Sequence, residues 1–217
     1  MMPPAPAHQS QRQPESLRER KKRLTREAIF AAAHELFAER GFDGVTVAEI
    51  ADAANISVKT LFTYIGSKEE LLFSGQPTVL DAVVEAVRSR RLGQTPLVAA
   101  GQALLTAVDD QDRGLDPLLR AASSGPAARS RLRAILDEAE DALARVLVSR
   151  RDGPRELAAR RLTAAQIMVL VRAVTSAEVA DLVAKSGDTD RRRKEALKDW
   201  IRDAAGQLAR GLQATGP

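Results

Sequence analysis

The hydrophobic residues of this chain recur at the three- and four-residue spacing of amphipathic helices over most of its length. Ile29, Ala33 and Phe37 illustrate this spacing in the first predicted helix. That helix spans residues 17–40, and Gly41 follows it as a stop signal. No segment of any length alternates apolar and polar residues as a half-buried strand would. The pattern therefore predicts an all-α protein.

Capping residues, prolines and glycines mark the ends of further helices. Thr95 followed by Pro96 has the order that is typical of a helix start. Gly187 interrupts a long apolar segment, and Asp188 is expected to cap the last helix. Beyond residue 66, the predicted helices span residues 67–74, 78–90, 96–108, 116–123, 126–148, 154–184 and 188–212.

Residues 46–65 carry the most specific pattern. Thr46 can cap a short helix, and Glu49 three residues later can complete a capping box. Asn55 tolerates the left-handed conformation that a tight turn requires, and Ser57 can cap a second short helix. Two short capped helices joined by such a turn form a helix-turn-helix, whose second helix enters the major groove of DNA.

The inner and outer faces of this motif fit the same interpretation. Ala51 is small where the two helices approach closely, and Leu61 and Ile65 point inward from the second helix. The outer face of that helix carries hydrogen-bond donors and no acid: Ser57, Lys59, Thr60, Thr63 and Tyr64. An ordinary helical hairpin of a bundle is the alternative, but its exposed face would normally mix both signs of charge.

A basic stretch precedes the motif. Residues 18–26 contain six lysines and arginines and one acid, Glu19. A solvated helix start is one interpretation, and contact with DNA phosphates or the minor groove is the other. The candidate DNA contacts in this stretch are Arg20, Lys22 and Arg23.

Residues 25–72 resemble the DNA-binding domain of the TetR family of transcriptional regulators, in order and without gaps. The residues that carry the resemblance are Ala33, Leu36, Phe37, Gly41, Thr46, Ile50, Ala51, Ser57, Thr60, Leu61, Ser67, Lys68 and Glu69. The resemblance implies a three-helix unit that reads an inverted-repeat operator on double-stranded DNA as a homodimer. It further implies a larger helical domain that dimerises and often encloses a small-molecule pocket, so that ligand binding releases the DNA.

Matched to the family by position, Thr46, Ser57 and Lys68 are expected to contact phosphates and Lys59 a base. The neighbouring residues expected at the DNA are Val58, Thr60, Thr63 and Tyr64. Phe62 departs from the family pattern, because a tyrosine usually contacts phosphate there, and Thr63 or Tyr64 can substitute for it. Lys68 also lies at the start of a helix, where its charge opposes the dipole and suggests an outside anion.

The C-terminal part offers candidates for a dimer interface and a ligand pocket. A single recognition helix buries little surface, so such motifs act in symmetric pairs. The apolar face of the last helix is a candidate interface, or else core within one subunit: Trp200, Ile201, Ala204 and Leu208. The polar interruptions of the 154–184 segment are candidate ligand contacts, or else pair at the helix edge: Gln166 and Arg172, with Met168 beside them. The predicted ligand is an apolar effector with a polar end.

Composition excludes several other classes. Aromatic residues make up 3% of the chain, too few for recognition of nucleic acid by base stacking. The chain has no cysteine and two histidines, which excludes a disulfide framework and a histidine-rich metal site. His8 and His34 are expected to be solvated. Without a catalytic motif or cofactor signature, no enzymatic activity is expected.

The predicted organisation is a disordered tail over residues 1–16, a helix-turn-helix DNA-binding domain over 17–75 and a helical ligand-binding and dimerisation domain over 76–217. No apolar run is long enough to span a membrane, and a cytoplasmic protein is expected. The predicted function is a ligand-released repressor. The alternatives are a regulator that activates without ligand, a helical protein-interaction module and, more remotely, a small helical enzyme.

Overall fold

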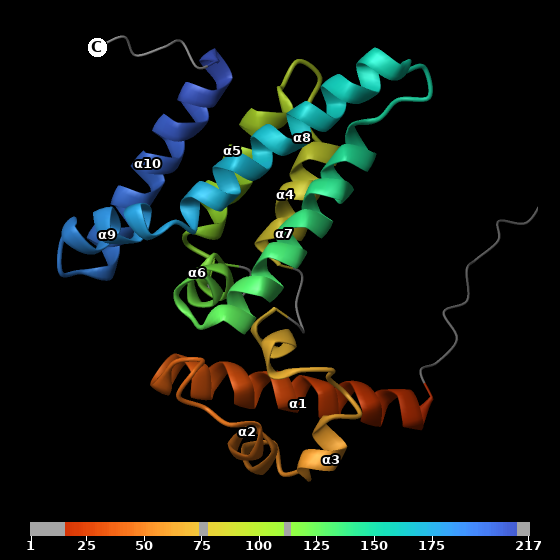
Figure 1. Cartoon of the computed structure of the whole chain (residues 1–217), viewed down its shortest axis with the longest axis vertical. Coiled ribbons are helices and arrows are strands. Elements are labelled where there is room, and N and C mark those ends of the chain that lie inside the picture. The colour runs from red at the N-terminus through yellow and green to blue at the C-terminus, as the bar shows by residue number, and fades with distance from the viewer. Residues whose placement is uncertain (1–15, 74–77, 111–113, 212–217) are drawn as a thin grey trace, which may run out of the picture.

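The computed structural model describes residues 16–73, 78–110 and 114–211, and within these ranges it is all-helical, with no strand (Figure 1). The predicted fold class is confirmed. The elements are α1 (Leu17–Arg40), α2 (Val47–Ala53), α3 (Val58–Leu61), a 3₁₀ helix η1 (Lys68–Leu72), α4 (Val79–Arg88), α5 (Pro96–Ala107), α6 (Asp116–Ser123), α7 (Pro126–Leu147), α8 (Pro154–Val174), α9 (Ala177–Lys185) and α10 (Asp190–Arg210). No helix in the described part of the chain is long and apolar enough to cross a membrane.

The helices form a small N-terminal unit at one end of the molecule and a larger body above it. Figure 1 shows α1 lying across the base, with α2 and α3 beneath it and η1 between α1 and the body. In the body, α4 packs against α5 and α7, α7 packs against α8, and α10 packs against α5. Because η1 contacts α1, α6 and α7, it joins the two parts.

Apolar side chains of α1, α2 and α3 pack together in the N-terminal unit, as part of a core that continues into the larger body. Phe37 of α1, Ile50 of α2 and Leu61 of α3 are all buried there. The ring centroids of Phe37 and Phe42 lie 5.1 Å apart in a tilted arrangement, which is a favourable geometry for an aromatic pair. The inward face predicted for the helix-turn-helix is therefore confirmed.

The structure corrects three expectations about helix ends. The apolar segment 154–184 is two helices, because Ser176 caps α9 by accepting a hydrogen bond from the backbone N–H of Val179, 3.3 Å away. Thr189, and not Asp188, caps α10. The segment expected as an α-helix over residues 67–74 contains the 3₁₀ helix η1, and the Ser67 side chain makes no cap hydrogen bond.

The prediction that His34 is solvated is wrong. Its Nε2 atom donates a hydrogen bond to the carbonyl oxygen of Leu71 in η1, over 2.9 Å. Burial lowers the pKa of His34 below its usual value, against the opposite effect of that hydrogen bond. The residue therefore joins α1 to η1. The sequence of α1 does not indicate this contact, because His34 lies on the polar face of α1 and η1 covers that position only in the folded chain. The predicted tail lies outside the described residues, apart from Ser16, which caps α1. The predicted domain boundary at residues 75–77 also lies outside the described residues.

Candidate DNA-binding surface

Thr46 and Glu49 form the capping box that the sequence predicts at the start of α2. The backbone N–H of Thr46 donates to Glu49 Oε2 over 2.7 Å, and Thr46 Oγ1 accepts from the backbone N–H of Glu49 over 3.3 Å. Thr46 Oγ1 also donates its proton to Glu49 Oε2, over 2.7 Å. The Thr46 hydroxyl would therefore have to exchange that bond in order to donate to a phosphate.

Arg40 supports the same box from the end of α1. Its Nη2 atom lies 2.7 Å from Glu49 Oε1 in an ion pair. The Thr46 hydrogen bonds, together with Arg40, hold the pKa of Glu49 at about 2. The carboxylate is thus ionised at neutral pH, and it links the two helices that flank the Gly41–Gly44 turn.

The turn between α2 and α3 has the predicted conformation. Asn55 has a φ of 54°, and among the non-glycine residues of the described ranges it is the one with positive φ. Asparagine adopts this left-handed region at a modest cost. The backbone N–H of Ile56 then donates to the carbonyl of Ala51, over 2.9 Å, which closes the turn.

Ser57 and Thr60 shape the exposed start of α3. Ser57 Oγ accepts from the backbone N–H of Thr60 over 3.0 Å, and the two hydroxyl oxygens lie 2.8 Å apart. Since one hydroxyl must donate to the other, a single hydroxyl proton remains for an outside acceptor. The regular α-helix ends at Leu61, and 3₁₀-type bonds continue the chain to Tyr64. The Thr63 hydroxyl donates to the carbonyl of Thr60 over 2.6 Å.

The outer face of α3 presents Val58, Lys59 and Phe62 to solvent. Phe62, which directly follows α3, is 51% exposed although its side chain is large and apolar. This exposure fits contact with a partner surface. Phenylalanine has no hydroxyl, so Phe62 cannot donate a hydrogen bond to a phosphate. The Lys59 ammonium makes no hydrogen bond or ion pair with any described residue, so it is available to a partner outside the chain.

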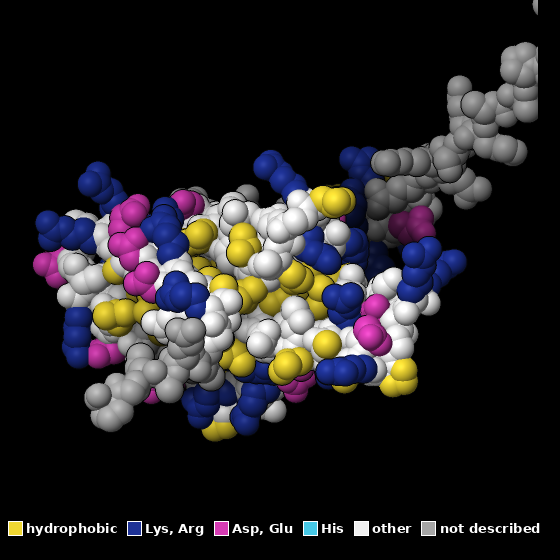
Figure 2. Space-filling model, turned by 90° about the horizontal axis from the view of Figure 1, so that it is seen from above, with side chains coloured by type: hydrophobic (Ala, Val, Ile, Leu, Met, Phe, Trp, Pro, Cys, Tyr) yellow, Lys and Arg dark blue, Asp and Glu magenta, His cyan; other side chains and the backbone are white. Residues whose placement is uncertain are grey.

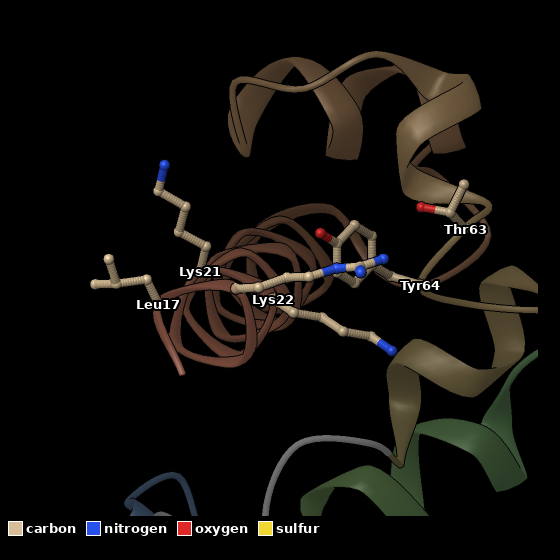
Figure 3. A pocket seen from close by; sticks show the side chains of 6 residues that line it. Leu17, Lys21, Lys22, Thr63 and Tyr64 are labelled. Carbon is tan, nitrogen blue, oxygen red and sulfur yellow. The ribbon is translucent and has the colours of Figure 1, made fainter. Parts of the chain in front are cut away.

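The basic start of α1 and the end of the α3 segment line one surface pocket of about 630 Å³. Figure 3 shows the Tyr64 ring turned towards the first turns of α1, from which Lys21 and Lys22 project in different directions. The structure thus brings Lys22, Thr63 and Tyr64 together, although they lie some forty residues apart in the chain.

Two residues that line this pocket, Arg18 and Lys21, were not among the candidate contacts. The spacing of Arg18 was a usable signal, because Arg18 lies three residues before Lys21 and four before Lys22, and such positions are neighbours on a helix surface. Arg20 is exposed on α1. Arg23 is also exposed and pairs with Glu27 over 2.9 Å.

The Lys68 side chain lies over two buried aromatic rings of the N-terminal unit. Its ammonium nitrogen is 4.1 Å from the centroid of the Phe42 ring and 5.9 Å from that of Phe37. Partial burial lowers the pKa of Lys68, and the charges of Asp43 and Glu69 oppose this shift. A cation over an aromatic face is stabilised by the ring quadrupole. The resting position of Lys68 is therefore explained without an outside anion.

The three candidate ligand residues lie in different environments. Met168 is fully buried in the core, Gln166 is exposed on α8, and Arg172 reaches across to α7. Arg172 lies 2.6 Å from Asp137 and 3.2 Å from Glu140. This arrangement agrees with the alternative interpretation, in which Arg172 pairs with acids at the edge of its helix.

The candidate interface residues of α10 lie against the subunit's own core. Ile201 has no exposed surface, so its side chain is not available to a partner subunit. Trp200, Ala204 and Leu208 also pack against the core and remain partly exposed. The periodicity alone did not distinguish these roles, because a helix buried in one subunit and a helix at an interface show the same apolar face.

Comparisons with known proteins agree with this geometry. The sequence model described as bacterial regulatory proteins, tetR family, matches residues 29–74. The chain is 29% identical over 208 residues to the HTH-type transcriptional regulator TcmR of Streptomyces glaucescens, covering 87% of this chain and 92% of that protein. It is 33% identical over 70 residues to the HTH-type transcriptional regulator HbdR of Aromatoleum sp. (strain CIB), covering 32% and 31% of the two chains.

Among solved structures, a TetR transcriptional regulator from Chloroflexus aurantiacus J-10-FL superimposes with a TM-score of 0.46 at 20% identity, covering 88% of this chain and 96% of that one. The family match falls on the helix-turn-helix and the elements that support it, and the similarity to TcmR extends through the larger helical part. Residues 29–74 therefore match the tetR family of bacterial regulatory proteins, and most of the chain is similar to an HTH-type transcriptional regulator.

Proposed function

We propose that this protein is a repressor that binds an inverted-repeat operator as a homodimer and releases it when a small molecule binds to the larger helical part. It acts through binding and not through catalysis, at DNA in the cytoplasm. The observation that carries the DNA-binding part is the surface formed by the basic start of α1 and the acid-free outer face of α3. Exposed cations there stand on a support that capping hydrogen bonds hold in place.

Within this surface we assign two kinds of contact. Lys59 projects from α3, the helix that would enter the major groove, and is assigned to a base edge. Lys22 and Tyr64 lie at the junction of α1 and the α3 segment, and are assigned with Arg20 to the phosphate backbone. Thr46 and Ser57 lie at helix starts and are assigned to phosphates as well.

The homodimer is supported by apolar surface on α8. Leu162 and Val169 are 62% and 52% exposed, and they lie seven residues apart on the same side of that helix. Gln166, four residues after Leu162, shares this side. Figure 2 shows apolar side chains gathered across the middle of the end face opposite the DNA-binding domain, with charged side chains towards its rim. Exposed apolar surface of this kind is typical of contact with a partner, and we assign α8 with the exposed edge of α10 to the dimer interface.

Release by a ligand requires that the ligand prefers one arrangement of the two DNA-binding units over another. The contacts through which α6 and α7 reach η1 provide a route, because η1 also packs on α1. A small shift of α6 would therefore move the support of the helix-turn-helix. In a dimer, that shift would change the distance between the two α3 helices.

A gel-shift titration tests this proposal with the full chain and the DNA that flanks its own gene. The expected result is a discrete complex with one dimer per inverted repeat, with an affinity that falls steeply as salt rises. Scrambled DNA of the same composition is the control. Equal affinity for both DNAs would exclude operator recognition, and no binding to either at low salt would favour a helical protein-interaction module instead.

A further inference from the structure

A second pocket, of about 620 Å³, opens in the larger helical part where α6, the corner between α8 and α9, and the start of α10 meet. Its volume lies within the range of pockets that hold drug-sized ligands. None of the three candidate ligand residues lines it. In Figure 1, α8 descends to this corner and the chain then turns through α9 into α10. The break at Thr175 and Ser176, which the sequence pattern did not predict, forms part of its wall.

The pocket wall is mostly apolar and carries charge of one sign. Leu119, Val174, Val183 and Leu197 contribute apolar side chains from four different helices. The charged residues of the lining are Arg120 and Arg193, and the lining includes no aspartate or glutamate. An apolar cavity with a few polar groups is the usual form of a small-molecule site, in which the polar groups orient the ligand.

The two arginines keep charge available for a ligand. Arg193 Nε donates to the carbonyl oxygen of Gly187 over 3.1 Å, which positions the guanidinium and does not neutralise it. Neither Arg120 nor Arg193 forms an ion pair with an acid of the described ranges. Arg172 differs, because Asp137 and Glu140 both pair with it. Arg120 is half-buried and Arg193 is exposed at the pocket's edge. A half-buried guanidinium without an acidic partner, such as that of Arg120, favours an anion.

We propose that this pocket is the effector site and that it binds a molecule with an apolar body and one anionic end, such as a carboxylate. This inference rests on the proposed function, because it assigns the site and the chemical class of the ligand that releases the DNA. The apolar body lies against the walls from α6, α8, α9 and α10. The anionic end pairs with Arg120, and Arg193 closes the pocket from α10.

The position of Arg120 connects this site to the DNA-binding domain. Arg120 lies on α6, which packs against η1. The charge of Arg120 contributes to the lowered pKa of His34 in α1. His34 in turn donates its hydrogen bond to the Leu71 carbonyl in η1. A ligand anion beside Arg120 therefore changes the electrostatic environment of the junction between the two parts of the molecule.

Isothermal titration of the full chain with naphthoate and with naphthalenemethanol tests the ligand class, because the two probes share an apolar body and differ in charge. We expect naphthoate to bind more tightly by on the order of tenfold, the value of one charge-assisted hydrogen bond. Arg120→Gln and Arg193→Gln remove that preference, and the matched control Arg172→Gln retains it. Ala180→Phe, which fills the pocket, abolishes binding of both probes while far-UV circular dichroism stays unchanged.

The inference is wrong if the probes bind equally, if Arg120→Gln retains the preference for naphthoate, or if Ala180→Phe still binds. Operator affinity is measured separately by gel shift at saturating naphthoate. Charge-dependent binding at this pocket without any change in operator affinity would support the site and contradict ligand release. Ligand release by molecules that do not compete with naphthoate would contradict the site and leave the proposed function intact.

Discussion

Asp43 caps a helix of the other part of the molecule. Its Oδ2 atom accepts a hydrogen bond from the backbone N–H of Gly125, 3.2 Å away, across 82 positions of sequence. Gly125 is the N-cap residue of α7 and has no side chain with which to cap that helix. A Cβ on Gly125 would lie 3.3 Å from Asp43 Oδ1, so glycine also allows this close approach. The turn between α1 and α2 is thus tied directly to the start of α7.

Replacing Asp43 with alanine is expected to lower the free energy of unfolding by about 1 kcal/mol, the usual value of an N-cap. The first turn of α7 loses the acceptor for one of its N–H groups and a favourable charge at its dipole. Urea denaturation measures the stability, and hydrogen exchange of the first turn of α7 reports the local effect. Asp52→Ala, which removes an exposed acid on α2, is the control. Unchanged exchange at the start of α7 would contradict the capping role.

Much of this fold could be predicted because helix caps and turns depend on residues that are close together in the sequence. The capping box at Thr46 and Glu49, the left-handed Asn55 and the Thr95–Pro96 start were all predictable from residues within a few positions of each other. The break at Ser176 was missed although serine is a common cap. The apolar spacing on both sides of it continues without interruption, so the pattern fitted one helix as well as two.

The site residues that sequence reasoning missed depend on tertiary contacts. Asp43 and Gly125 meet only because η1 places α7 above the turn that precedes α2. Arg120 and Arg193 lie on helices whose order in space cannot be read from periodicity. Arg172 attracted attention as a charge in an apolar segment, but its acidic partners lie 32 and 35 residues away on α7.

Lys59 and Lys22 are expected to differ in their effect on DNA binding. Lys59→Ala removes a contact to a base edge, so discrimination between the operator and variants at one position falls by about 1–3 kcal/mol. Lys22→Ala removes a phosphate contact, so affinity for all sequences falls together and the salt slope decreases by about one. Gel shifts over a salt series, with the operator and single-base variants, separate the two effects. Equal loss of discrimination in both proteins would contradict the assignment.

The Glu49 carboxylate is expected to titrate near pH 2. Because its folded-state pKa is depressed from an unfolded value of about 4.5, its contribution to stability is complete above that value and is lost as the pH falls through about 2. Side-chain NMR of Glu49 follows the titration directly. Thr46→Val removes the largest cause of the shift and raises this pKa, whereas Thr46→Ser retains the hydroxyl and the low value. A midpoint that Thr46→Val leaves unchanged would contradict the role of the Thr46 hydroxyl.

His34 is expected to make the contact between α1 and η1 sensitive to mildly acidic pH. Because burial depresses its folded-state pKa below an unfolded value of about 6.5, folding favours the neutral ring. Its contribution is therefore complete above about 6.5 and is lost as the pH falls through the folded-state pKa. His34→Gln can still donate to the Leu71 carbonyl but does not titrate.

The melting temperature of the wild-type chain should therefore fall more between pH 7.5 and pH 5.5 than that of His34→Gln, because His34 binds a proton more readily in the unfolded chain and glutamine does not titrate. The matched control His8→Gln removes the chain's other histidine and should follow the wild type. Should His34→Gln show the same acid dependence as the wild type, another group must carry it. If the substitution also makes operator affinity independent of pH over the same range, the hydrogen bond to Leu71 controls how η1 supports the helix-turn-helix.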